Sequence, residues 1–511
     1  MIQSIIQALS PMMLLLVVGG TLWGVMAGAL PGISASMAII LILPFTFGMT
    51  LYQSVSILMG TYVGAMCGGH ISAILLRTPG TPSAAATVFD GYPMAKAGLA
   101  GRAIGIAILS SAFGGIVSGF SLAILAPILG RWALNFQSAE FFALALLGLS
   151  CTASIGAKSW SKALLSAVLG LLLSTVGMDP ISGVQRFMFG NFALSDGISF
   201  IPVMIGTFAF AEVYRNVASK TGTPDGQFVK MTKEQKEEKR KNVEKVKIDI
   251  VGPRHIVKNW FVYIKSTLIG IGIGVIPAAG ASIASMIAYG EAKRSSKTPE
   301  LFGHGAEEGI IASETSDSAA VGASLIPTLT LGIPGGPVAA IILVSLTMHG
   351  VIPGPQMVTD QPTVVRGILF AIIIASLSLF GWGIFVTKQF SKLTTAPYPI
   401  LGSIILVMGL IGAFTLRGNT LDLVILMIFS FVGVGFEKFG YSVPAFILGL
   451  VLGPIAEVGF RRQLIVTHGD WTSFFTRPFS LVVLIAAVLS FAWPFIQAKK
   501  AAKKDASKAE K

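Results

Sequence analysis

A helix-breaking stretch lies between two apolar segments near the start of the chain. Residues 68–93 read GGHISAILLRTPGTPSAAATVFDGYP, and the PGTP at 79–82 interrupts the apolar run. Proline lacks a backbone N–H and clashes with the preceding turn, and glycine adds conformational freedom, so a helix ends here. Inside a bilayer, an interrupted backbone persists only where protein or a water-filled cavity satisfies its polar groups. The stretch therefore predicts a functional break at membrane depth.

Three further breaks strengthen this prediction. The sequence IPGGP at 333–337 places its first proline 255 residues after that of PGTP, and LPGISAS at 30–36 is matched by IPAAGAS at 276–282. Interrupted segments at corresponding places in two halves indicate a transporter binding site. The structural alternative is a set of kinked spans whose Ser and Thr side chains bond to the preceding turn.

Composition predicts an all-α polytopic membrane protein. The chain is 53% hydrophobic and 12% charged, whereas soluble chains are about 25% charged. Apolar runs near the length of a membrane span recur along nearly the whole chain, which predicts about 10–12 transmembrane helices, some broken or re-entrant. The runs are continuously apolar rather than alternating, which argues against a transmembrane β-barrel.

Charge divides the chain into two membrane repeats. A segment with 12 Lys/Arg and 6 Asp/Glu separates the halves, and the end of the chain carries six lysines. Such basic segments are typical of the cytoplasmic side, so the net charge of +13 does not indicate nucleic-acid binding. The predicted parts are membrane repeat 1, a cytoplasmic linker, membrane repeat 2 and a basic cytoplasmic tail, over residues 1–214, 215–258, 259–497 and 498–511.

Loop charges favour inverted repeats. Lys96 and Arg102 follow the PGTP break, whereas Lys293 and Arg294 precede the PGGP break. Opposite bias in equivalent loops is what inverted topology produces. Towards the end of the repeats, lysines at 162 and 438 both indicate the cytoplasm, which requires an extra crossing in the second half, for example 400–416, and departs from strict inversion.

Local features at the cysteines and at the start of the chain are structural. Cys67 and Cys151 lie in apolar segments and are expected to be packing residues rather than a disulfide or a metal pair. The first 20 residues lack a basic n-region and an A-x-A-like site, so we expect them to form the first membrane segment and not a cleaved signal.

The breaks supply the predicted substrate site. Backbone N–H groups at an interrupted helix favour anions, and freed carbonyls coordinate cations. We predict that substrate binds at Pro31, Gly32, Ser34, Ser36, Arg77, Thr78, Pro79, Gly80, Thr81, Ser83, Gly280, Ser282, Pro334, Gly335 and Gly336.

Ionisable side chains near the breaks are further candidates, because such groups are expensive inside a membrane. Arg77 suits a carboxylate; alternatively it snorkels or pairs with Asp90 or Asp317. His70 is a second candidate substrate contact.

The polar run ETSDS at 314–318 allows two interpretations. It is either a helix N-cap or a source of oxygen ligands for a cation. The candidate ion-binding residues are Ser285, Glu314, Ser316 and Asp317. No other cofactor is expected, and no H-E-x-x-H, P-loop, G-x-S-x-G or Cys/His cluster is present, so the sequence does not indicate an enzyme.

At the four breaks the sequence resembles the large membrane (permease) subunit of tripartite tricarboxylate transporters. The similar stretches begin at Gly28, Gly68, Gly274 and Leu325 and read GALPGISASMAIILILPFT, GGHISAILLRTPGTPSAAATVFDGYPMAKAGLAGRA, GVIPAAGASIASMIAYGEAKRSS and LIPTLTLGIPGGP. The resemblance covers essentially the whole chain. It departs at His70 and Arg77, where small or amide side chains are expected, and at 315–318, where an alanine/asparagine run is expected.

The resemblance implies secondary, ion-driven uptake of a di- or tricarboxylate across a bacterial inner membrane. It also implies a small four-span membrane subunit, a periplasmic solute-binding protein and Na⁺, with H⁺ as the other coupling ion. An uncoupled carboxylate channel or uniporter remains an alternative, as does a membrane-embedded enzyme or scaffold.

Overall fold

The computed structural model describes residues 10–492, except 31–32, 156–159, 221–248, 250, 278–279 and 395–397. Helices dominate this part of the chain, in which one short antiparallel pair, β1 (Gly177–Met178) and β2 (Gln185–Arg186), is the only sheet. The predicted all-α class is therefore confirmed. Most of the predicted linker and the whole basic tail lie outside the described residues.

Many of the described helices are apolar enough to lie in a membrane. Seven are apolar but shorter than a full span. Six are long and apolar enough to cross one, namely Pro11–Ala29, Leu51–Leu76, Ala100–Ala133, Pro362–Gln389, Thr420–Phe439 and Val443–Val466. This supports the prediction of a multi-pass protein with both full and interrupted spans.

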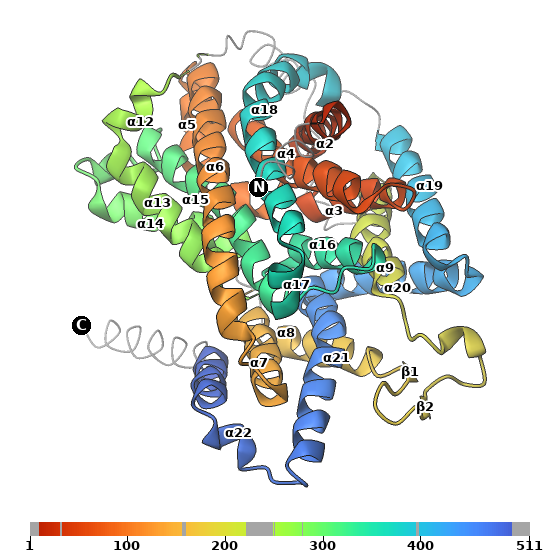
Figure 1. The fold of residues 1–511 in the computed structure, drawn as a ribbon. Helices are drawn as coiled ribbons and strands as arrows, with labels where there is room; N and C mark the ends of the chain where they lie inside the picture. The colour runs from red at the N-terminus through yellow and green to blue at the C-terminus, as the bar shows by residue number, and fades with distance from the viewer. Residues whose placement is uncertain are drawn as a thin grey trace, which may run out of the picture. The chain divides into compact units, whose positions relative to one another are not determined.

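The chain forms two compact units, and each unit combines segments from both halves of the sequence (Figure 1). Unit 1 contains residues 1–131 and 208–418. Its elements are α2 (Pro11–Ala29), α3 (Ala35–Ile42), η1 (Leu43–Thr46), α4 (Leu51–Leu76), η2 (Pro82–Ala85), α5 (Val88–Lys96), α6 (Ala100–Ala133), α10 (Ala211–Lys220), α12 (Arg254–Lys258), α13 (Trp260–Gly274), α14 (Gly280–Ser295), η5 (Pro299–Leu301), α15 (Glu307–Leu331), α16 (Pro337–Met348), α17 (Pro355–Asp360), α18 (Pro362–Thr394) and α19 (Tyr398–Arg417).

Unit 2 contains residues 132–207 and 419–511. Its described elements are α7 (Ser138–Ile155), α8 (Trp160–Leu173), the strands β1 and β2, η3 (Phe192–Leu194), α9 (Phe200–Met204), α20 (Thr420–Phe439), α21 (Val443–Val466), α22 (Ser473–Thr476) and the helix Pro478–Ala492. A π-helical turn, η4 (Ile205–Phe210), continues α9 into α10.

Glycines let α2 and α4 approach each other closely in unit 1. Both helices carry glycine every fourth residue, at 20, 24 and 28 and at 60, 64 and 68. A Cβ at any of these positions would overlap backbone of the other helix, for example the carbonyl oxygen of Ile57 for Gly20. Small residues at this spacing are the usual basis of close helix association in membranes.

The equivalent pair in the second half, α13 and α15, packs in the same way. A Cβ at Gly270 would overlap the carbonyl oxygen of Ser316, and one at Gly274 would lie 2.7 Å from the Ala323 side chain. Each half thus builds a close helix pair beside a break, with glycines on both helices in the first half and on α13 in the second.

In unit 2 the tripeptide Leu-Gly-Leu occurs once in each half of the sequence, at 169–171 and at 448–450. A Cβ at Gly170 would overlap the carbonyl oxygen of Phe446, and one at Gly449 would overlap that of Ala167. The repeated glycines therefore lie in one contact, between α8 and α21, to which each half of the sequence contributes one glycine.

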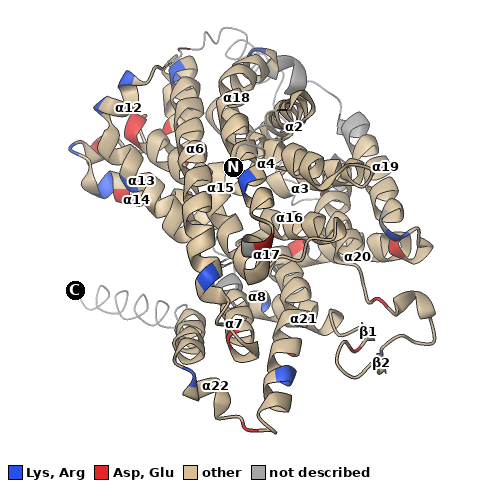
Figure 2. Cartoon of the chain, in the orientation of Figure 1, with Lys and Arg blue, Asp and Glu red and all other residues tan. Residues whose placement is uncertain are grey.

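Two stretches with charged residues are helical. The region 90–102 contains the end of α5 and the start of α6. Helix α15 begins at Glu307, seven residues before the polar run 314–318 that the N-cap interpretation would place at a helix start. Glu307 and Glu308 lie in the first turn of α15, where acidic side chains interact favourably with the positive end of the helix dipole. These polar residues therefore belong to the helix and not to a loop. Figure 2 shows charged residues gathered over α12, α13 and α14.

Neighbouring glycines in α2 offer a direct test of the close helix contact. Gly20→Ala forces the α2 and α4 backbones apart and should lower stability by about 1–3 kcal/mol, as overpacking does. Gly19→Ala is the matched control, because no atom outside its own helix lies within 4 Å of its Cβ. Thermal unfolding of the detergent-solubilised protein should give a lower midpoint for Gly20→Ala only. Equal midpoints would contradict the contact.

Candidate functional site

At both the PGTP and the PGGP break the chain folds back onto the helix that precedes it. After α4 the chain turns back so that the Gly80 N–H donates to the Gly69 carbonyl at 3.2 Å. After α15 the Gly335 N–H donates to Thr328 Oγ1 at 3.2 Å, and a Cβ at Gly335 would lie 2.5 Å from the Ser324 carbonyl oxygen. Each break folds onto its own helix, and this satisfies backbone groups that the interruption frees.

Within each half, the two breaks lie against one another. In addition, segments that follow the breaks of one half pack against segments of the other half. A Cβ at Gly80 would overlap the Gly28 carbonyl oxygen, next to the LPGISAS break, and one at Gly336 would lie 3.9 Å from the Gly280 Cα. Helix α3 packs against α16, and η2 packs against α14, where Ser285 Oγ donates to the Ser83 carbonyl at 2.8 Å. All four predicted breaks therefore meet inside unit 1.

Most of the predicted site residues are buried at this meeting point. Pro31 and Gly32 lie outside the described residues, and Ser34, Gly280 and Ser282 are half-buried. Arg77, Thr78 and Pro79 are exposed. The buried ones are Ser36, Gly80, Thr81, Ser83, Ser285, Glu314, Ser316, Asp317, Pro334, Gly335 and Gly336.

Hydroxyl groups at the breaks have short-range partners. Ser34 Oγ caps α3 by accepting from the Met37 N–H at 3.2 Å, and Thr81 Oγ1 lies 3.1 Å from Ser83 Oγ. Helices α3, α14 and α16 begin at breaks, and the N-terminus of a helix favours an anion. The arrangement suits a small anion that carries its own acceptor oxygens.

Arg77 lies away from the buried cluster and ends α4 in the left-handed conformation, with φ 60°. Its guanidinium lies over the Tyr92 ring, 5.7 Å from the centroid. The equivalent residue after α15 is Gly332, with φ 70°. The arginine therefore occupies a position whose backbone suits glycine. Neither predicted acidic partner pairs with it: Asp90 accepts from backbone N–H groups, and Asp317 lies beside His70.

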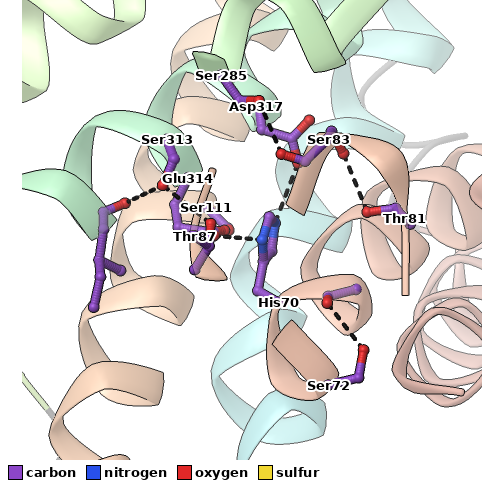
Figure 3. A network of polar contacts seen from close by, with 12 residues as sticks. His70, Ser72, Thr81, Ser83, Thr87, Ser111, Ser285, Ser313, Glu314 and Asp317 are labelled. Carbon is purple, nitrogen blue, oxygen red and sulfur yellow. Dashed lines mark hydrogen bonds and ion pairs between the residues drawn. The ribbon is translucent and has the colours of Figure 1, made fainter. Parts of the chain in front are cut away.

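His70 lies between two buried acids of α15 (Figure 3). Its Nδ1 is paired with Glu314 Oε1, and its Nε2 lies 3.1 Å from Asp317 Oδ2. Glu314 also accepts from Thr87 Oγ1 and from Ser111 Oγ, the latter at 3.1 Å. The histidine and both acids are at most 1% exposed, so the cluster places three ionisable groups inside the protein.

The N-cap interpretation of residues 314–318 was wrong. They lie in the middle of α15 and are buried, and Ser316 Oγ donates to the Ala312 carbonyl of its own helix at 2.7 Å. The two acids instead flank His70, so two of the positions that depart from the resembling family contact each other. Within the described residues, no group of three or more His, Cys, Asp and Glu side chains is disposed to hold a metal ion.

Asp90 is a structural anchor that the sequence did not identify. Its Oδ1 accepts from the N–H groups of Gly303, Gly305 and Ala306 at 2.7 to 2.9 Å. These bonds fix the loop before α15 against α5 and so set the depth at which Glu314 lies. The sequence around Asp90, FDGYP, gave little indication of this role, because the partners of Asp90 lie more than 200 residues away. Thr87 and Ser111, which donate to Glu314, were missed for the same reason.

The apolar helices and the gathered breaks define a multi-pass membrane protein. The chain matches, over residues 14–448, the family described as "Tripartite tricarboxylate transporter TctA family". It belongs to that family and is thereby a subunit of a tripartite tricarboxylate transporter.

Two relatives come from Agrobacterium vitis. One, "Uncharacterized 52.8 kDa protein in TAR-I ttuC' 3'region", is 37% identical over 96% of both chains. The other, "Uncharacterized protein in TAR-II ttuC' 3'region", is 34% identical over 45% of this chain and 96% of its own length. No solved structure matches the chain.

The left-handed backbone at Arg77 predicts an unusual order of stabilities. Arg77→Ala keeps the unfavourable conformation and loses the ring contact, whereas Arg77→Gly relieves a strain worth about 1 kcal/mol. The glycine variant should therefore be more stable than the alanine variant in thermal unfolding of the solubilised protein. An alanine variant as stable as the glycine variant would contradict the assignment.

Proposed function

We propose that this subunit imports a di- or tricarboxylate anion by secondary active transport across a bacterial inner membrane. The observation that carries the proposal is the meeting of four interrupted helices in one buried region. Half-helix N-termini there favour carboxylate groups, and protein groups accept hydrogen bonds from the Gly80 and Gly335 N–H groups of the broken backbone. A cation gradient, of Na⁺ or H⁺, supplies the energy for accumulation.

Two partners complete the proposed system. A periplasmic solute-binding protein delivers the anion, and a small four-span subunit accompanies this chain in the membrane. Family membership supports both partners, since tripartite systems contain three components. Substrate then enters between the half-helices while one group of breaks opens to the outside and the other stays closed.

Arg77 is proposed as an accessory contact for the arriving anion. Its guanidinium is exposed next to the PGTP break, so it attracts a carboxylate before the anion reaches the buried serines and glycines. Arg77→Gly keeps the backbone geometry and should weaken uptake more than it lowers the amount of protein in the membrane. Unchanged uptake kinetics would remove Arg77 from the site.

Ser83 tests the buried part of the site. Ser83→Ala removes one hydroxyl but keeps the carbonyl that accepts from Ser285, so the fold should persist. Loss of one hydrogen bond to substrate, about 1 kcal/mol, should raise the half-saturating concentration about fivefold. Ser295→Ala is the control, because its hydroxyl bonds to its own helix at the exposed end of α14.

The uptake assay uses the three-component complex in liposomes, with labelled citrate and succinate as probes. Accumulation above the external concentration, dependent on an imposed cation gradient, supports secondary transport. Equilibration without accumulation would indicate an uncoupled channel or uniporter instead.

A further inference from the structure

The His70 cluster lies where α4 of the first half crosses α15 of the second half. With an imidazolium and two carboxylates, the cluster carries a net charge of −1; one more proton makes it neutral. A net charge is costly in a membrane interior, so binding of one proton, which makes the cluster neutral, is favourable there. We infer that the cluster holds one exchangeable proton, which makes H⁺ the coupling cation of the transport proposed above.

Asp317 is the group that takes this proton. Glu314 is paired with His70 through Oε1 and accepts hydrogen bonds from Thr87 and Ser111, so both of its oxygens have partners. Asp317 Oδ2 faces only the His70 ring, and Asp317 Oδ1 has no hydrogen-bond partner among the described residues. The proton adds to this carboxylate and leaves from it, with no other bond made or broken.

Among the described residues, no other charged side chain forms an ion pair with His70, Glu314 or Asp317, and Lys265 of α13 is paired instead with Glu291 of α14. From α4, Tyr62 has its hydroxyl 3.5 Å from Ser324 Oγ, and Cys67 is a buried free thiol. From α5, Asp90 accepts three backbone N–H groups. Helices α2, α3 and α16 contain no charged residue, and α6 contributes the hydroxyl of Ser111.

The position of Asp317 connects the proton to the substrate site. Figure 3 shows its side chain between His70 and the Ser83–Ser285 pair, where η2 meets α14. An ionised Asp317 repels an anion at the adjacent break, and a protonated one does not. Protonation from the outside therefore precedes carboxylate binding, and release of both to the inside completes the cycle.

Sodium is disfavoured at this place by the same geometry. The imidazole occupies the space between the two carboxylates, with one ring nitrogen directed at each. A bound Na⁺ would lie beside a positively charged ring, whereas a proton only completes the charge balance.

Infrared difference titration of the purified full-length protein in lipid tests the proton directly. A carboxylic acid carbonyl band should appear and disappear with pH in the wild-type protein and be lost in Asp317→Asn. Asp470→Asn, in an exposed loop, should keep the band. If Asp317→Asn fails to fold, His70→Gln, which removes the imidazolium, should shift the midpoint instead. A band that persists in Asp317→Asn, or an unshifted midpoint in His70→Gln, overturns the inference.

Uptake into liposomes distinguishes this inference from the proposed function on which it rests. With the three-component complex and labelled citrate or succinate, a pH gradient without Na⁺ should drive accumulation in wild type and in Asp470→Asn. Asp317→Asn should lose this accumulation but keep exchange of labelled for unlabelled probe. Accumulation driven by Na⁺ and not by a pH gradient overturns proton coupling. Absence of uptake under every gradient overturns the proposed function, and the infrared titration then decides the proton site alone.

Discussion

Satisfaction of the backbone in interrupted helices is the constraint on which unit 1 depends. Each break would leave N–H and carbonyl groups without partners in a lipid environment. The chain solves this by folding Gly80 and Gly335 onto the helices that precede them. Neither contact leaves room for a side chain, so glycine at these two positions is required by the fold itself. The half-helix ends that could bind an anion are a consequence of this packing.

The exchange of segments between halves makes one site out of two repeats. Helix α14 contacts η2, and α16 contacts α3, so the breaks of each half are covered in part by helices of the other half. The His70 cluster has the same character, with the base from α4 and the acids from α15. Movement of one half against the other would therefore alter both the anion site and the charged cluster together.

Local chemistry made the breaks and most helices predictable from sequence. Pro and Gly mark the ends of α4 and α15, and long apolar runs mark the spans. The start of α15 was missed because a tertiary contact fixes it, since Asp90 holds the loop before Glu307. The partners of His70 were missed for a related reason, because no sequence pattern connects residues 244 or more positions apart. Aligning the repeats at an offset of 255 would have matched Arg77 with Gly332 and revealed the left-handed turn.

The contact between α8 and α21 has a consequence for the history of the chain. Gly170 fits against the backbone of the second half, and Gly449 fits against the backbone of the first. If the halves arose by duplication, a single ancestral glycine would have met its own copy across this contact. A larger residue acquired by either copy alone would have pushed both apart, so the two copies were bound to keep the same residue while the sequence around them diverged.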